Sequence, residues 1–240
     1  MSTPHALITG STRGIGLAIA SQLARSGYVP ILNYVHDDER ANHALAHLQH
    51  ICTGTRLIQA DVATESGVQS LFERAREYGP IEVLVNNVGK FLFKPFLETS
   101  LDEWSDILDS NLTSTVLCCK QVLPFMRAQH KGHIINIAAM HASDVRARPN
   151  TLPYAIAKSG VIHLTQTLAK TEAPYGIRVN AVCPGFIAGG DHTNPDDVAK
   201  IPLGRLGQPQ DIAAVIRFLV SEESAYMTGA ILEIHGGALL

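Results

Sequence analysis

Short apolar runs alternate along the whole chain with longer segments whose apolar residues recur at helical spacing. Continuous runs of this length between turn residues are typical of buried strands. They predict seven strands, which are Ala6–Thr9, Val29–Tyr34, Arg56–Ala60, Ile81–Val85, His133–Ile137, Arg178–Cys183 and Ile231–His235.

The segments between these strands predict amphipathic helices, with a kink near Pro124 in the longest of them. The helical segments are Ile15–Ser26, Asp38–His50, Glu65–Tyr78, Leu101–Gln129, Pro153–Ala173 and Pro209–Val220. This alternation predicts one α/β domain over residues 1–240, a Rossmann-type doubly wound fold. Its seven-stranded, mainly parallel sheet would carry helices on both faces and bind ligands at the carboxyl ends of the strands.

Composition narrows the class of protein. Hydrophobic residues make up 46% and charged residues 17%, so a large core is available and disorder is not expected. A formal net charge of −3 gives no indication of a nucleic-acid partner or an anionic membrane surface. No apolar run is long enough for a membrane span, and the first residues do not have the pattern of a signal peptide. Neither the histidines nor the cysteines have the spacing of metal ligands. The four cysteines are Cys52, Cys118, Cys119 and Cys183, and we expect them to be reduced thiols in a cytoplasmic protein.

A glycine-rich turn lies between the first predicted strand and the first helix. It reads Thr-Gly-Ser-Thr-Arg-Gly-Ile-Gly over residues 9–16. Glycines let the backbone approach a phosphate, and the start of a helix offers free N–H groups and the positive end of its dipole. The turn is therefore a candidate nucleotide site, and its candidate residues are Gly10, Ser11, Arg13, Gly14, Ile15 and Gly16.

Tyr154 and Lys158 are four residues apart in a predicted helix, so their side chains share one face. Free tyrosine titrates near 10, and a neighbouring ammonium stabilises the phenolate and lowers that pKa. General acid–base catalysis needs a tyrosine tuned in this way. The pair is a candidate proton-transfer group, although an ordinary surface pair has the same spacing.

Five motifs in order resemble the short-chain dehydrogenase/reductase superfamily. They are the glycine turn, Asn86-Asn87-Val88-Gly89, Asn111, the Tyr154/Lys158 pair and the segment Pro184–Ile187. Three segments near the end resemble the bacterial 3-oxoacyl-(acyl carrier protein) reductases, a tail pattern shared by members with other substrates: Gly204–Gly207, Pro209–Ala213 and Tyr226–Gly229.

The resemblance implies a nicotinamide cofactor. The position that selects NAD with a carboxylate is Tyr34, and Arg13 stands where NADP-preferring members often carry a base. NADP(H) is therefore expected, and Asp37 and Asp38 keep NAD(H) open as the alternative. The remaining cofactor residues implied by the resemblance are Asp61, Val62, Asn87, Gly89, Tyr154, Lys158, Pro184, Gly185 and Ile187.

The resemblance also implies a catalytic mechanism. Tyr154 would protonate a carbonyl oxygen as hydride arrives, Lys158 would lower the pKa of the tyrosine and hold the ribose, and Asn111 would anchor a water. The family's catalytic serine has no counterpart, because Ala138 and Ala139 occupy its place.

Three accounts of the missing serine stay open. His141 or Ser143 substitutes for it, the enzyme tolerates the loss of roughly 10²–10³ in rate that one oxyanion donor is worth, or the protein binds nucleotide without turnover. His141 has the family's serine-to-tyrosine separation if two residues are inserted around Asp144–Asn150, where Arg146 and Arg148 occur.

The activity implied by the resemblance is reduction of a carbonyl, or the reverse oxidation, on an acyl thioester or another small molecule. Reduction of a 3-oxoacyl thioester is expected first, and pteridine or other ketone reduction and a non-catalytic nucleotide sensor are the alternatives. The segment Ala188–Pro202 would form a polar, acidic lid over the substrate. The resemblance also implies a homotetramer, with Leu101–Gln129 and the Tyr154 helix building one interface.

Overall fold

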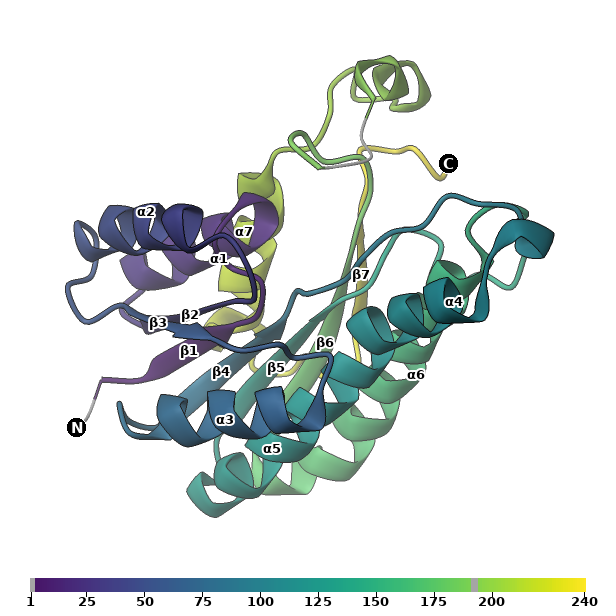
Figure 1. Cartoon of the computed structure of the whole chain (residues 1–240). Coiled ribbons are helices and arrows are strands. Elements are labelled where there is room, and N and C mark those ends of the chain that lie inside the picture. The colour runs from purple at the N-terminus through teal and green to yellow at the C-terminus, as the bar shows by residue number, and fades with distance from the viewer. Residues whose placement is uncertain (1–2, 191–193) are drawn as a thin grey trace.

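Seven parallel strands form one sheet in the computed structural model, which describes residues 3–190 and 194–240 (Figure 1). Their order across the sheet is β3-β2-β1-β4-β5-β6-β7. The strands are β1 (His5–Ile8), β2 (Val29–Tyr34), β3 (Arg56–Gln59), β4 (Ile81–Asn86), β5 (Gly132–Ile137), β6 (Ile177–Pro184) and β7 (Ile231–Ile234). Each predicted strand is present, and its ends lie within one residue of the predicted ends.

Helices cover both faces of the sheet, as predicted. Helices α1, α2 and α7 lie on one face, and α3, α5 and α6 lie on the other (Figure 1). Their bounds are α1 (Gly14–Arg25), α2 (Asp38–Gln49), α3 (Glu65–Arg76), α4 (Leu101–Leu108), α5 (Ser114–Gln129), α6 (Leu152–Glu172) and α7 (Pro209–Leu219). Short 3-10 turns occur at Phe96–Glu98, Ala173–Tyr175, Pro195–Lys200 and Glu222–Ser224. The Rossmann-type fold class is confirmed.

Strand β1, an inner strand of the sheet, has apolar side chains on both faces, so both faces must pack against helices. Ala6 and Ile8 belong to the core beneath α1, α2 and α7, whereas Leu7 belongs to the core beneath α3 and α5. All three side chains are fully buried. A strand that is apolar on both faces is typical of a parallel sheet between two helical layers.

The structure corrects one element of the prediction. The helix predicted over Leu101–Gln129 is interrupted by a π-helical turn at Asp109–Thr113, whereas α5 runs through Pro124 without a break. Polar side chains at the turn hydrogen-bond back to the main chain: Ser110 Oγ donates to Asp106 O at 2.7 Å, and Ser114 Oγ donates to Ser110 O at 2.7 Å. Such bonds compete with the regular helical ladder, and π turns are common at functional sites.

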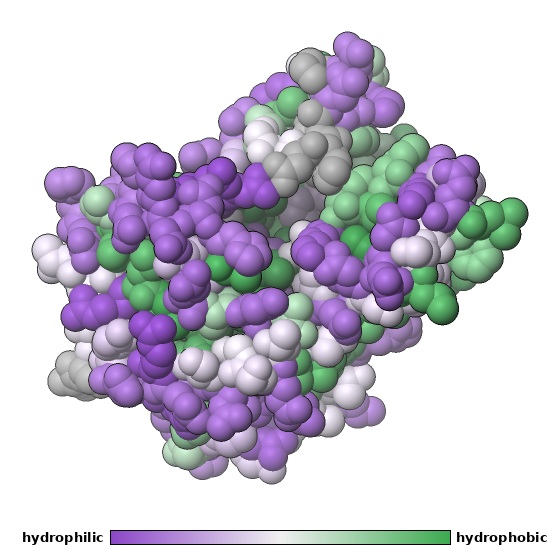
Figure 2. Space-filling model, viewed as in Figure 1, coloured by the Kyte–Doolittle hydropathy of each residue, from purple (hydrophilic) through white to green (hydrophobic). Residues whose placement is uncertain are grey.

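The surface beside α4 is apolar. Four side chains between β4 and the start of α4 are exposed, which are Phe93, Phe96, Leu97 and Leu101, and Figure 2 shows apolar residues gathered on this side of the molecule. None of the described helices is long and apolar enough to cross a bilayer. The apolar patch beside α4 lies next to the segment Leu101–Gln129, which we expect at a subunit interface.

Candidate active site

Two adjoining cavities lie at the carboxyl edge of the sheet. The smaller, of about 400 Å³, is lined by the glycine turn and the end of β2. The larger, of about 720 Å³, is lined by Tyr154, Lys158 and the loops after β4, β5 and β6. Both cavities share Arg13, Ile15, Asn87, Gly89, Ile187 and Gly190. One elongated molecule can therefore reach from the glycine turn to Tyr154.

The glycine turn fits a pyrophosphate. Gly10 and Gly14 have φ of +59° and +53°, a left-handed conformation that favours glycine. A side chain at Gly16 would collide with the main chain, because its Cβ would lie 2.5 Å from Gly10 O. Helix α1 begins without a side-chain cap and without an acidic residue in its first turn. Its positive end is therefore suited to an anion, as predicted from the sequence.

Buried amides hold this turn in place. Asn87 Nδ2 donates to Thr9 O and Gly10 O, both at 3.0 Å, and Asn33 Nδ2 donates to Ala60 O at 2.9 Å. Ser11, predicted to bind cofactor, is fully buried, and its hydroxyl donates to Ile8 O at 2.8 Å and accepts from the Asn33 N–H. The Ser11 side chain therefore supports the turn from behind, whereas Asn87 also lines both cavities.

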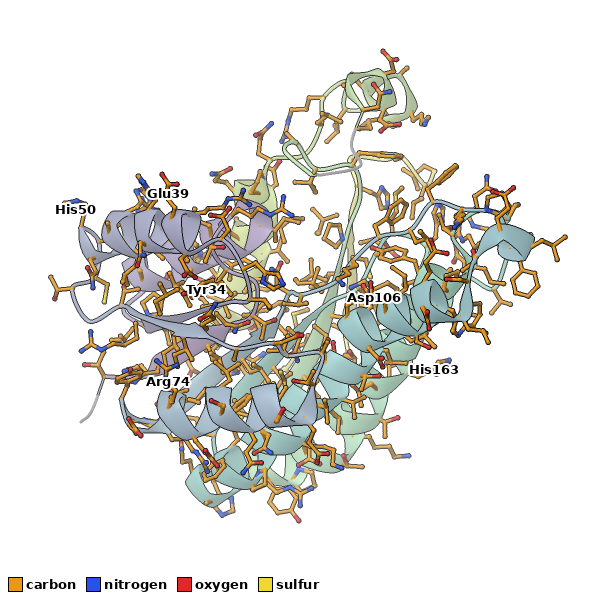
Figure 3. The ribbon with its side chains drawn as sticks, viewed as in Figure 1. Tyr34, Glu39, His50, Arg74, Asp106 and His163 are labelled. Carbon is orange, nitrogen blue, oxygen red and sulfur yellow. The ribbon has the colours of Figure 1, made fainter. Side chains whose placement is uncertain are left out.

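The far end of the smaller cavity is basic. Tyr34 ends β2 (Figure 3), and it lines the cavity together with Arg13, His36 and Arg40. Arg40 Nη2 lies 2.7 Å from Asp37 Oδ2, and the Asp38 carboxylate shares a hydrogen bond with the Tyr34 hydroxyl. Sequence reasoning missed Arg40. The signal that could have found it was an arginine in the first turn of α2, shortly after β2, whose end was expected to contact the ribose.

The structure does not bring Asp61 and Val62 to the cavity lining. Val62 is buried in the core, and Asp61 is exposed with its carboxylate accepting from the Ala63 N–H at 3.0 Å. Their predicted contact with an adenine stays a prediction. By contrast, Pro184, Gly185 and Ile187 all line the larger cavity, as expected of the segment after β6.

Tyr154 and Lys158 lie on the cavity-facing side of α6. Lys158 is buried, and its Nζ donates to Ile137 O at 2.7 Å and lies 5.8 Å from the centre of the Tyr154 ring. The Tyr154 ring also meets Phe91 edge-on, with ring centres 5.0 Å apart. The predicted pair is therefore part of the site and not a surface pair.

Burial dominates the titration of this pair. It raises the pKa of Tyr154 to about 12, and Cys183 adds to the rise; it lowers the pKa of Lys158 to about 8, against an opposing effect of Cys183. The pKa of Tyr154 therefore rises where the spacing predicted a fall, because removal from water disfavours the phenolate. At neutral pH the tyrosine is therefore a phenol, the form that donates a proton.

The π-helical turn places Asn111 beside this pair. Its side-chain amide donates to Lys90 O at 2.8 Å and to Ile107 O at 2.9 Å, while its buried Oδ1 has no partner among the described residues. A Cβ on Gly89 would collide with Asn111 and approach Lys158 Nζ. Glycine at position 89 therefore lets the asparagine and the lysine come together.

The loop after β5 holds the predicted substitute for serine. Ala138 and Ala139 line the larger cavity, and so does His141, whose Nδ1 lies 3.0 Å from Asp144 Oδ2. His141 has a φ of +65°, an uncommon conformation for a residue with a side chain. Ser143 is exposed and does not line the cavity, so the structure favours His141 over Ser143.

Sequence reasoning missed several other residues of the larger cavity. They are Lys90, Phe91, Met140, Arg148 and Thr151. The arginine-bearing segment around Arg148 was visible as an insertion before the Tyr154 helix, but nothing in it indicated which side chains turn inward. In the lid, Asp191 and His192 lie outside the described residues, and Asp197 accepts from Lys200 Nζ at 2.7 Å.

The fold and the two joined cavities fit a nucleotide-dependent oxidoreductase, because the glycine turn leads directly to a half-buried tyrosine and a buried lysine. No group of three or more described histidine, cysteine or acidic residues could hold a metal. A family model named adh_short_C2 and described as Enoyl-(Acyl carrier protein) reductase matches residues 10–238. The chain belongs to the short-chain dehydrogenase/reductase superfamily and is an NAD(P)-dependent oxidoreductase.

The proteins to which this chain is similar have different named activities. The 3-oxoacyl-[acyl-carrier-protein] reductases of Staphylococcus aureus (strain Mu50) and of a Synechocystis species are 36% and 38% identical, covering 98% of this chain and 98% and 96% of theirs. Glucose 1-dehydrogenase 2 of Bacillus subtilis is 36% identical, covering 98% of this chain and 94% of its own. The crystal structure of a short chain dehydrogenase from Bacillus anthracis superposes with a TM-score of 0.90 at 30% identity, covering 99% of this chain and 97% of that one.

The lowered pKa of Lys158 predicts a pH dependence for catalysis. The ammonium would stabilise the phenolate formed if Tyr154 gives up its proton in catalysis, and this positive charge is lost as the pH rises through about 8. We expect kcat/KM for reduction to be level below about pH 7 and to fall about tenfold per pH unit well above the pKa. The measurement is the initial rate of cofactor oxidation across this range.

A Lys158→Arg variant is the control, because arginine keeps its charge throughout the range. The variant should be slower at neutral pH but should not show the fall. A fall of the same shape in the variant would assign it to another group.

Proposed function

We propose that this protein reduces a carbonyl to an alcohol with NADPH, and that Tyr154 donates the proton. The observation that carries this proposal is the position of Tyr154 beside buried Lys158, in a cavity that adjoins the glycine turn. The 3-oxoacyl-carrier-protein reductases among the relatives make a 3-oxoacyl thioester the first substrate to test. The same site also runs the reverse oxidation.

The mechanism rests on groups already in place. A bound NADPH supplies the hydride. Tyr154 donates its proton to the carbonyl oxygen, and the Lys158 ammonium stabilises the resulting phenolate and holds the ribose. Asn111 holds the Lys90 main chain through its side-chain amide and would anchor the water through which a proton returns.

We assign to His141 the contact that the family's serine makes. With Nδ1 at Asp144, Nε2 is the ring nitrogen left for a substrate oxygen, and it donates when the ring is protonated. The left-handed backbone at His141 and its place in the cavity lining support this role, because strained residues gather at functional sites.

The direct test of the proposal is turnover. We expect purified protein to oxidise NADPH with acetoacetyl thioesters or with members of a ketone and pteridine panel. Tyr154→Phe, which keeps the ring and its contact with Phe91, should lower kcat about 10²–10⁴-fold with little change in NADPH affinity. No turnover with any carbonyl while NADPH still binds tightly would favour a nucleotide-sensing protein.

The role of His141 has its own test. His141→Ala should lower kcat at least about tenfold and leave the Kd for NADPH unchanged, because the lost donor acts on the substrate oxygen. His141→Gly removes the same ring without backbone strain, so the two variants should agree.

Ser143→Ala is the matched control, since Ser143 is exposed and outside the cavity, and its rate should equal that of the parent. Ala139→Ser measures the alternative account. An unchanged rate in both His141 variants, together with a faster Ala139→Ser enzyme, would show that the site tolerates the loss.

We propose NADP(H) over NAD(H), because Arg13 and Arg40 line the smaller cavity and no carboxylate among the described residues does. Arg13→Ala and Arg40→Ala should each lower the ratio of kcat/KM for NADPH to that for NADH at least about tenfold, since a guanidinium–phosphate bond is lost. Arg25→Ala removes an exposed arginine from the other end of α1 and should leave the ratio unchanged. A ratio near one in the parent would overturn the preference.

Other properties follow from the same resemblance. We propose a homotetramer in which α4, α5 and α6 build an interface, and the exposed apolar side chains beside α4 support a covered surface there. We also propose a cytoplasmic location, in keeping with four free cysteines.

A further inference from the structure

The wall of the larger cavity is positively charged. The described side chains that line it include Arg13, Lys90, Arg148 and Lys158, with His141 beside them, and no aspartate or glutamate. A cavity of one sign attracts a molecule of the opposite sign. A nicotinamide cofactor accounts for part of this charge, but not for the part on the substrate side.

Most of these cations already have a role. Arg13 belongs to the glycine turn, Lys158 Nζ donates to Ile137 O, and Lys90 Nζ lies 2.6 Å from Asp106 Oδ1. Arg148 is half-buried in the loop before α6, and its Nη2 makes only a long bond of 3.4 Å to His141 O. The nearest acid, Asp144, is held by His141 Nδ1 at 3.0 Å and by Arg146 Nη2 at 3.4 Å.

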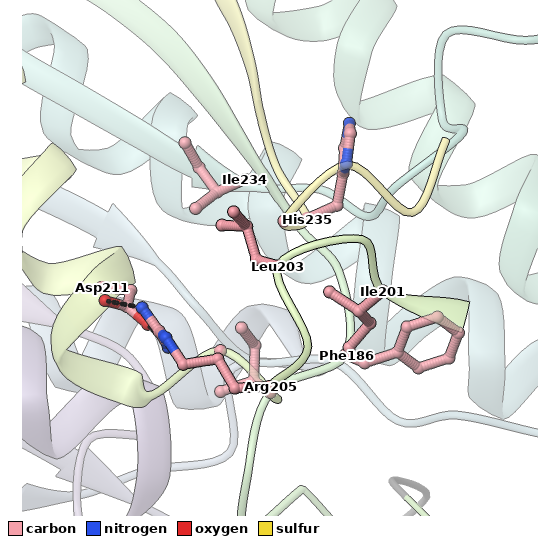
Figure 4. Close-up of a pocket in the computed structure, with 10 residues that line it drawn as sticks. Phe186, Ile201, Leu203, Arg205, Asp211, Ile234 and His235 are labelled. Carbon is pink, nitrogen blue, oxygen red and sulfur yellow. Dashed lines mark hydrogen bonds and ion pairs between the residues drawn. The ribbon is translucent and has the colours of Figure 1, made fainter. Parts of the chain in front are cut away.

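Burial and the neighbouring Arg146 lower the pKa of Arg148, and the carboxylate of Asp144 opposes them only in part. Arg205 at a nearby hollow of about 270 Å³ is different, because Asp211 pairs with it through two bonds (Figure 4). Arg148 has no such partner among the described side chains. It is therefore the arginine on the substrate side that lacks a counter-ion.

The groups beside Arg148 also suit an anion. Thr151 begins α6 and lines the cavity, and its side chain makes no cap bond to the helix. The positive end of a 21-residue helix therefore faces the same space as the guanidinium. Tyr154, two residues into that helix from Leu152, lies in the same lining.

We propose that Arg148 binds a carboxylate of the substrate, so that the preferred substrates are oxo acids, with the acid group held at Arg148 while the carbonyl faces Tyr154. This inference rests on the proposed carbonyl reduction. The planar guanidinium matches the two oxygens of a carboxylate, whereas a phosphate dianion usually draws more than one cation. Neutral oxo thioesters would still react, but less efficiently.

The test compares free oxo acids with their methyl esters, which keep the carbonyl and lose the charge. Acetoacetate and levulinate are paired with methyl acetoacetate and methyl levulinate. We expect kcat/KM to favour the acids at least about tenfold, the value of one charge-assisted hydrogen bond, and mainly through KM. Arg148→Ala should bring the ratio of acid to ester close to one, and Arg148→Lys should restore part of it.

Arg146→Ala is the matched control, because Arg146 is an exposed arginine two residues away that does not line the cavity. It should keep the preference for acids. Equal kcat/KM for acids and esters in the parent, or the same ratio in Arg148→Ala, would overturn the assignment. Failure of the proposed carbonyl reduction is a different result, since no acid, ester or thioester would then oxidise NADPH.

Discussion

The site depends on one buried cation. Lys158 is 4% exposed, and such a charge is costly to bury unless polar groups surround it. The Ile137 carbonyl at the end of β5 accepts from its ammonium, and Gly89, by having no side chain, leaves room for it. Helix α6, the loop after β4 and the end of β5 must therefore meet at one point, which is the carboxyl edge of the sheet.

The close packing of Gly89, Asn111 and Lys158 also accounts for the π-helical turn between α4 and α5. Asn111 can reach Lys90 O and still lie beside Gly89 because the chain takes a π turn there instead of continuing from α4 directly into α5. Its buried Oδ1, without a partner among the described residues, lies close to the position that a Gly89 Cβ would take. The Asn111 Oδ1 oxygen therefore has an electrostatic role, because an unpaired acceptor near the buried Lys158 ammonium helps to balance its positive charge.

The fold could be read from the sequence because parallel strands are continuous apolar runs, and the order of motifs placed Tyr154, Lys158, Asn111 and the glycine turn in one site. The π turn could not be read, since its cause is side-chain bonding to the main chain within a segment of helical pattern. Arg148 was also out of reach, because loop conformation decides which arginine turns inward, whereas Arg40 in the first turn of α2 was overlooked. The pKa of Tyr154 was misjudged for a related reason: a spacing of four residues shows the lysine, but not the burial of both groups.

The balance of charges also argues for a direction of catalysis. A tyrosine with a pKa of about 12 and a lysine with a pKa of about 8 make a neutral acid beside a cation near its own titration point. In the proposed mechanism, reduction uses Tyr154 as the acid and gains from the Lys158 cation, because negative charge develops on the tyrosine as its proton leaves. Oxidation begins from the phenolate, which burial disfavours. In the proposed mechanism, the charges of Tyr154 and Lys158 therefore favour donation of a proton.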